Sequence, residues 1–110
     1  MPFRVGYVVK AAGADPSIHR AKISADSLEL TVRMVDSADW QRVIAVCEDL
    51  VEVDQVDAIT LCPGFSHAEV GRIAEAVGSA VAIDVARSDA HGAQLASHAM
   101  QRAKSQEASA

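Results

Sequence analysis

Leu61-Cys62-Pro63-Gly64-Phe65-Ser66-His67-Ala68-Glu69 is the stretch of sequence that decides the fold. The aliphatic run before it predicts a buried strand that ends at Cys62, and Pro63-Gly64 predicts a turn. Ser66 and Glu69 have the spacing of a capping box, so a helix is expected to begin directly after the turn. A strand that runs into a helix through a short turn is the unit of an α/β sheet, and ligands usually bind at this end of such strands.

The length and the composition limit the classes of protein that are possible. With 110 residues, half of them hydrophobic, the chain is long enough for one domain with its own core. We assign residues 1–104 to a single α/β domain and residues 105–110 to a disordered tail. The net charge of −5 and the lack of a basic cluster argue against nucleic acid, and no apolar run is long enough to cross a membrane. Two cysteines, Cys47 and Cys62, suit reduced thiols in the cytoplasm.

Alternation and periodicity predict a chain of strand-and-helix units. Strands are expected at residues 3–10, 28–35, 58–62 and 80–87. Helices are expected at residues 36–53, 67–77 and 89–104. Asp15-Pro16 is a helix-start signal and predicts a short helix or a single turn over residues 17–24. Four such βα units predict a mostly parallel, four-stranded sheet.

Each expected strand has one aliphatic side and one side of small or charged residues. The simplest packing puts every helix on the aliphatic side, and right-handed crossovers on one side then give the strand order 1-2-3-4 of half a (βα)8 barrel. A flavodoxin-like order is the alternative, if the first short helix crosses to the other side of the sheet. The opposite side is then expected to carry Arg4, Lys10, Glu29, Thr31, Arg33, Thr60, Cys62 and Asp84.

Charges on a broad sheet face require either water or partner groups. Two copies that meet through their polar faces would enclose a lined cavity. We therefore predict a homodimer or a higher homo-oligomer with the polar faces turned inward. A monomer whose polar face is solvated is the alternative.

Three side chains are candidates for acid/base chemistry. Cys62 precedes a helix N-terminus, whose dipole favours the thiolate, and His67 lies in the first turn of that helix as a base or an ion-pair partner. Asp84 interrupts an apolar strand and is a candidate general base. The alternatives are structural: Cys62 fills a tight end of the sheet, and Asp84 pairs with Arg33 or Arg4.

A second set of residues is a candidate for binding the substrate. Arg33 and Lys10 can hold a carboxylate or a phosphate, and Gly64 with the helix start at Ser66 offers backbone N–H groups to the same anion. His19 follows the first expected strand and could close over the site, although a solvated turn is the simpler interpretation. No residues have the spacing of a metal site, and no phosphate-loop or dinucleotide motif is present, so neither a metal nor a cofactor is expected.

Three stretches together resemble a small prokaryotic family of unknown function. They are Gly13-Ala14-Asp15-Pro16, His19-Arg20 and Leu61-Cys62-Pro63-Gly64-Phe65, and the similarity covers roughly residues 3–87. A second glycine commonly stands in that family where this chain has Pro63. The resemblance implies a compact α/β domain and no established activity.

A weaker resemblance concerns the start of the chain. Removal of Met1 would expose Pro2, and an N-terminal proline is the base in the tautomerase superfamily. The chain is similar to that superfamily only in this start and in its length, because the expected order of strands and helices differs.

The placement of these residues favours a small-molecule enzyme of proton-transfer chemistry. We expect a lyase or an isomerase that acts on a carboxylated or phosphorylated metabolite. A non-catalytic domain that binds a metabolite or another protein is the alternative, and a purely structural subunit is a third class.

Overall fold

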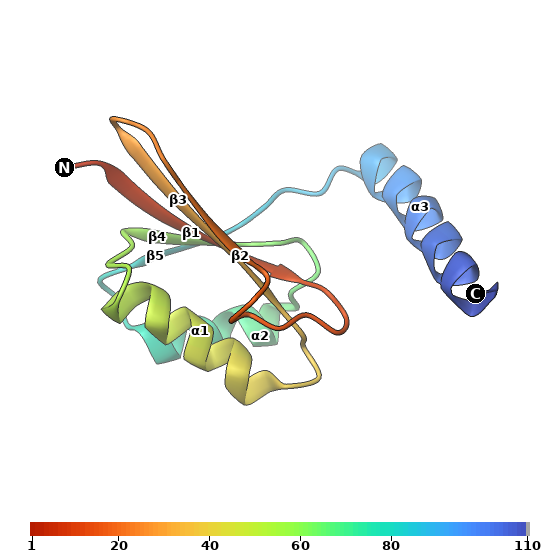
Figure 1. The fold of residues 1–110 in the computed structure, drawn as a ribbon, viewed down its shortest axis with the longest axis horizontal. Helices are drawn as coiled ribbons and strands as arrows, with labels where there is room; N and C mark the ends of the chain where they lie inside the picture. The colour runs from red at the N-terminus through yellow and green to blue at the C-terminus, as the bar shows by residue number, and fades with distance from the viewer. Residues whose placement is uncertain (110) are drawn as a thin grey trace.

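The computed structural model describes residues 1–109 and shows one five-stranded sheet with three helices (Figure 1). The strands are β1 (Phe3–Lys10), β2 (Arg20–Ser24), β3 (Leu28–Val35), β4 (Ala58–Leu61) and β5 (Ala82–Val85). The helices are α1 (Trp40–Glu52), α2 (His67–Val77) and α3 (Ala90–Ser109). Within the described residues, no helix is both long and apolar enough to span a membrane.

The strand order across the sheet is β2-β3-β1-β4-β5. Strands β3, β1, β4 and β5 are parallel, whereas β2 is antiparallel to β3. The half-barrel order 1-2-3-4 is therefore wrong. Helix α1 leads from β3 past β1 to β4, which places β1 inside the sheet, and the parallel strands follow the order 2-1-3-4 of flavodoxin-like sheets.

Strand β2 replaces the short helix or turn expected over residues 17–24. The helix-start signal at Asp15 makes only a local turn, in which the Ser17 hydroxyl donates to Asp15 Oδ1 (2.7 Å) and the His19 N–H donates to the Asp15 carbonyl (2.7 Å). After this turn, Ala21 and Ile23 pair with β3 in a hairpin. The pairing with β3 supplies a hydrogen-bonded ladder that the short polar segment cannot make as an isolated helix.

Helices α1 and α2 pack against each other on one side of the sheet (Figure 1). Beneath them lie Val8, which is 0% exposed, and Thr31, Arg33 and Val35. Because side chains alternate along a strand, the more aliphatic sides of β1 and β3 face away from these helices. The expected packing of helices on the aliphatic side is therefore wrong for β1 and β3 and correct for β4, where Ile59 and Leu61 are buried.

The side of the sheet opposite to α1 and α2 carries apolar side chains on three neighbouring strands. We call it the open face. Its residues on β1, β2 and β3 are Phe3, Val5, Tyr7, Val9, Ala21, Ile23, Leu28, Leu30, Val32 and Met34, and all of them are exposed or half-buried. The polar faces that were expected to meet in an oligomer instead lie partly beneath the helices.

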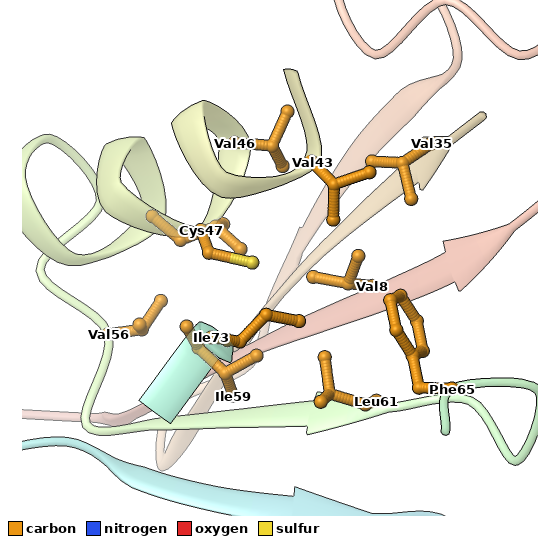
Figure 2. Packing of buried hydrophobic residues seen from close by; sticks show 11 residues of the cluster. Val8, Val35, Val43, Val46, Cys47, Val56, Ile59, Leu61, Phe65 and Ile73 are labelled. Carbon is orange, nitrogen blue, oxygen red and sulfur yellow. The ribbon is translucent and has the colours of Figure 1, made fainter. Parts of the chain in front are cut away.

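The core lies between the sheet and the two helices (Figure 2). Val8 and Val35 from the sheet meet Val43 and Cys47 from α1, and Ile73 from α2 lies beside them. This packing uses the small-residue side of β1 because it lets α1 approach closely: a Cβ on Gly6 would lie 2.9 Å from Leu50 Cδ1.

Charged side chains on the same side of the sheet form ion pairs around this core. Arg4 pairs with Glu29 (2.9 Å), and Lys22 pairs with Asp54 (3.0 Å). Long side chains can cover apolar surface with their stems while their charged ends reach partners or water. A polar strand side is thus compatible with burial beneath a helix layer.

Helix α3 lies apart from α1 and α2 and joins the sheet through an extended segment (Figure 1). It begins near the expected residue and continues to Ser109, so it includes most of the stretch 105–110 that the sequence analysis assigns to a disordered tail. Residue 110 lies outside the described residues.

The close approach of α1 to β1 makes Gly6 sensitive to substitution. Gly6→Ala is expected to lower the free energy of unfolding by about 1–3 kcal/mol, because the new methyl group overpacks a fully buried leucine. Gly71→Ala is the matched control: Gly71 lies on an exposed part of α2 with nothing near its Cβ position, and the change should stabilise by about 0.5–1 kcal/mol. Urea unfolding measures both, and equal effects of the two substitutions would contradict the packing.

Candidate functional site

The carboxyl ends of β1 and β4 lie side by side in the middle of the sheet. The chain leaves β1 toward β3 and leaves β4 toward β5, so the strand order reverses between these two ends. Such a switch point is where open α/β sheets bind ligands. Lys10 ends β1 here, and Cys62 directly follows β4.

Cys62 is held by backbone hydrogen bonds at this point. Its N–H donates to the Val8 carbonyl (3.1 Å), and its Sγ accepts the backbone N–H of Lys10 (3.4 Å). These two hydrogen bonds fix the position of the Cys62 side chain at the end of the sheet. The side chain is half-buried and free of any disulfide, so a small molecule can reach it.

The Cys62 thiol opens onto a cavity of about 550 Å³, which we call the thiol cavity. Its walls come from the ends of β1 and β4, the segment after β5 and the first half of α3. The residues are Val9, Lys10, Cys62, Pro63, Gly64, Ser88, Ala93, Ala96 and Met100. The size suits a small metabolite, and the lining is mostly apolar with a few polar atoms, as in typical ligand sites.

The ammonium group of Lys10 is fully engaged at the border of the thiol cavity. Its Nζ donates to the Gly64 carbonyl (3.0 Å) and to Glu69 Oε1 (2.8 Å), and it lies 4.8 Å from the centroid of the Phe65 ring. These contacts join the end of β1 to the loop after β4 and to α2. Lys10 thereby fixes the loop that carries Cys62, and its charge is balanced by a carboxylate.

The capping box predicted from Ser66 and Glu69 is present. The Ser66 N–H donates to Glu69 Oε1 (2.8 Å), and the Glu69 N–H donates to Ser66 Oγ (3.2 Å). The hydrogen bond from the Lys10 ammonium and the one from the Ser66 N–H hold the pKa of Glu69 below its ordinary value of 4.5. The first-turn N–H groups that this box does not use are those of His67 and Ala68, which makes them available to an anion.

The other two candidate catalytic residues, His67 and Asp84, lie outside the thiol cavity. His67 is the first residue of α2 and is exposed, close in sequence to the loop. Asp84 is exposed on β5 beside Thr60 of β4, on the side of the sheet that faces away from α1 and α2. Neither lines the thiol cavity, whereas Ser88, which follows β5, does.

Arg33 lies beneath α1, away from the thiol cavity. Its guanidinium donates to the Pro16 carbonyl (Nε, 3.1 Å) and to Asp49 on α1 (3.1 Å), and the residue is 5% exposed. This arrangement ties the loop after β1 to α1. Arg33 is therefore placed as a structural ion pair rather than beside the substrate-binding residues expected with it.

His19 belongs to the same loop. Its Nδ1 accepts the backbone N–H of Asp15 (2.9 Å), and Asp15 also pairs with Arg42 of α1 (2.5 Å). The Ser17 hydroxyl and the Ser17 N–H, together with the nearby Arg42 charge, hold the pKa of Asp15 below its ordinary value. The ring of His19 thus stabilises the turn between β1 and β2.

The Gly13-Ala14-Asp15-Pro16 stretch is fastened to the end of β3. Gly13 has a φ of 77°, a conformation that favours glycine, and its N–H donates to Asp36 (2.9 Å). The N–H groups of Ala38 and Gly13 hold the pKa of Asp36 below its ordinary value. A cavity of about 220 Å³ lies between this stretch and the start of α1.

Lys10, Cys62 and Gly64 thus line one cavity at the switch point, and Ser66 is the N-cap of the helix that follows them. Sequence reasoning missed the contribution of α3 to this cavity. The signal was the spacing of Ala93, Ala96 and Met100, which places them along one side of a helix. Pro2 lies at the opposite end of β1 from Cys62. Within residues 1–109, no three His, Cys, Asp or Glu side chains gather as a metal-ligand set.

The Glu69 carboxylate gives a prediction for stability at low pH. Its lowered pKa means that its contribution is fully present above pH 4.5 and is lost as the pH falls through the lower pKa of the folded protein. Glu69→Gln keeps a capping acceptor for Ser66 but loses the charge opposite Lys10, so the variant should be less stable than the wild type at pH 7 and more nearly equal to it in acid. Urea unfolding between pH 3 and pH 7 measures this difference.

Glu75→Gln, on the exposed part of the same helix, is the control and should leave the pH profile unchanged. A Glu69→Gln deficit that stays constant down to pH 3 would show that the charge of Glu69 does not contribute to stability through its contact with Lys10.

The two cysteines give a second prediction. Burial raises the pKa of Cys47 to about 12, and its side chain is 0% exposed, whereas Cys62 is half-buried at the cavity. Iodoacetamide at neutral pH should therefore alkylate the folded protein once, at Cys62, and a second time only in denaturant. Peptide mass spectrometry identifies the site, and alkylation of Cys47 in the folded protein would contradict this assignment.

Comparisons with known proteins identify a family but no reaction. Neither the curated proteins nor the solved structures give a significant match to the chain. The model of a family of unknown function, DUF6506, matches residues 3–101. The resemblance to a family without an established activity is thereby confirmed, and because the match covers nearly the whole chain, this protein belongs to the DUF6506 family.

Proposed function

We propose that this protein is a lyase or an isomerase that binds a small anionic metabolite in the thiol cavity and uses Cys62 as its acid/base group. The observation that carries the proposal is the position of the Cys62 thiol. It lies at the switch point of the sheet, accepts a backbone N–H from Lys10 at 3.4 Å, and opens onto a cavity of about 550 Å³. A thiol so placed can take a proton from a substrate carbon and return one to the product.

The start of α2 supports a carboxylated or phosphorylated substrate. Gly64 lines the cavity between Cys62 and the helix in the sequence, and the capping box does not use the N–H groups of His67 and Ala68. The positive end of a helix stabilises an anion at this position. The His67 ring can contact the same anion. Asp84 lies on β5 and would act only on a ligand that extends across β4 to that strand.

A non-catalytic binding domain is the second candidate function. The Lys10 ammonium, from the charged residue that lines the cavity with Cys62, is already paired with Glu69, and the apolar wall from α3 offers packing rather than proton transfer. This arrangement favours a protein that holds a metabolite without converting it. A cytoplasmic location is proposed for either function, because both cysteines are free thiols.

Native mass spectrometry of the purified protein is the first experiment, since it can identify a bound metabolite directly. That metabolite, or inorganic phosphate and small carboxylates if none is retained, should slow alkylation of Cys62 when added at saturating concentration. An unchanged alkylation rate with every compound would contradict binding in the thiol cavity.

The enzyme and the binding domain differ in what Cys62→Ala does. For an enzyme, the wild type should exchange a substrate C–H for deuterium in heavy water, and Cys62→Ala should retain ligand binding but lose this exchange by about 100-fold or more. Glu75→Gln is the control and should behave like the wild type. Exchange that persists in Cys62→Ala would remove Cys62 from the mechanism, and a ligand bound without exchange in the wild type would favour the binding domain.

A further inference from the structure

The open face is an apolar surface that one chain leaves uncovered except at its edge, where Val9 lines the thiol cavity opposite α3. It extends over β2, β3 and β1, which are neighbours in the sheet, so its side chains form one continuous patch. Ile23 is 62% exposed and Phe3 is 51% exposed. Continuous apolar patches on soluble proteins mark interaction sites, because their burial against a partner is favourable.

Helix α3 is a second uncovered apolar surface. Every residue from 90 to 106 is exposed, including Leu95 at 58%. Leu95, Ala99 and Ala103 follow one another at intervals of four residues and therefore lie along one side of the helix. Small side chains on this side permit a close approach to another surface. Ala93 and Met100, by contrast, lie on the edge that lines the thiol cavity.

The chain places α3 at the end of its own sheet, beside the thiol cavity, and not across the open face (Figure 1). Ala86 still donates to the Leu61 carbonyl (2.8 Å), and the first helical hydrogen bond runs from the Ala93 N–H to the Asp89 carbonyl (2.7 Å), so little chain is left between strand and helix. The molecule is 46 Å long, and its radius of gyration is 14.9 Å. A compact domain of this length has a radius of gyration of about 13 Å.

The charges of the two parts are complementary. Residues 1–89 hold fourteen of the fifteen acidic residues and eight of the ten basic ones. The sequence of α3 holds two basic residues, Arg102 and Lys104, and one acidic residue, Glu107, and thus a net charge of +1. A positively charged helix next to a negatively charged body favours association of α3 with the body of a second molecule.

We propose that two copies of this chain form a symmetric dimer in which α3 of each copy lies on the open face of the other. In this arrangement the open face and the α3 of each copy are both covered by the other copy, as two-fold symmetry requires. The 20 residues of α3 give a helix about 30 Å long, and the five strands span about 19 Å, so the helix can cross the whole sheet. With each helix taken as about 10 Å wide, the two contacts bury about 1,200 Å² in total, which is the lower limit of stable interfaces.

The open face also offers a place for an anchoring side chain. A hollow of about 290 Å³ beside β2 and β3 is lined by Ile18, Ala21, Val32 and Met34, among others. Leu95 is the one branched aliphatic residue in the stretch 90–106, so it is the side chain of α3 that we expect to enter this hollow. Large apolar side chains seated in such hollows supply most of the affinity at protein interfaces.

The test is the mass of the full-length protein in solution, measured by light scattering after size-exclusion chromatography at tens of micromolar. The wild type should have the mass of two 11.6-kDa chains. Leu95→Glu on α3 and Val32→Lys on the open face should each halve this mass, because a charge is buried in each contact. Gln94→Glu adds the same charge one residue away, on the polar side of α3, and should remain dimeric. Far-UV circular dichroism verifies that each variant is folded.

Mixing the two monomeric variants separates exchange of α3 from other modes of pairing. A mixed dimer has one contact of wild-type residues and one in which the new lysine faces the new glutamate, so the mixture should regain the dimer mass. A monomeric wild type would show that α3 closes on its own sheet or stays free, and a dimeric Leu95→Glu variant would show that the helix has no part in the interface. Either result overturns the proposal and leaves the thiol-cavity function untouched.

Discussion

The central position of β1 is the constraint on which the rest of the structure depends. This strand is paired with β3 on one side and β4 on the other, in parallel in both cases. In the register with β4, Val8 is the partner of Leu61. The residues that follow, Lys10 after Val9 of β1 and Cys62 after Leu61, therefore lie beside each other. The same position forces α1 to pass over β1 on its way to β4. The close contact of Leu50 with Gly6 follows from this crossing, as does the choice of which side of the sheet is covered.

Local features of the fold could be predicted from the sequence, and features set by distant contacts could not. The strand, turn and capping box from Leu61 to Glu69 involve residues at most a few positions apart, and all of them form. Alternation in β1 and β3 correctly separates two sides of each strand. It does not reveal which side α1 covers, because that depends on Leu50 meeting Gly6, more than forty residues away. Hydrophobicity alone favours the wrong side, since Arg4 and Arg33 lie on the covered one with partners to match.

The candidate site shows the same division. Cys62, Gly64 and Lys10 could be brought together from sequence, because parallel strands end at one edge of the sheet. The role of Lys10 could not, since a lysine at the end of a strand looks the same whether it binds a substrate or, as here, a carboxylate of α2. Arg33 fails for a related reason: its partner Asp49 lies on a helix whose path depends on the strand order. A charged residue in a strand indicates that it makes a polar contact, and the order of the strands determines which group is its partner.

Helix α3 connects the two surfaces on which function can depend. One edge of the helix supplies Ala93, Ala96 and Met100 to the thiol cavity, and the neighbouring edge carries the exposed Leu95. A molecule in the cavity contacts a helix whose other edge is available for packing. Both features therefore depend on where this one helix lies: the cavity takes part of its wall from α3, and the exposed Leu95 takes its position from the same helix.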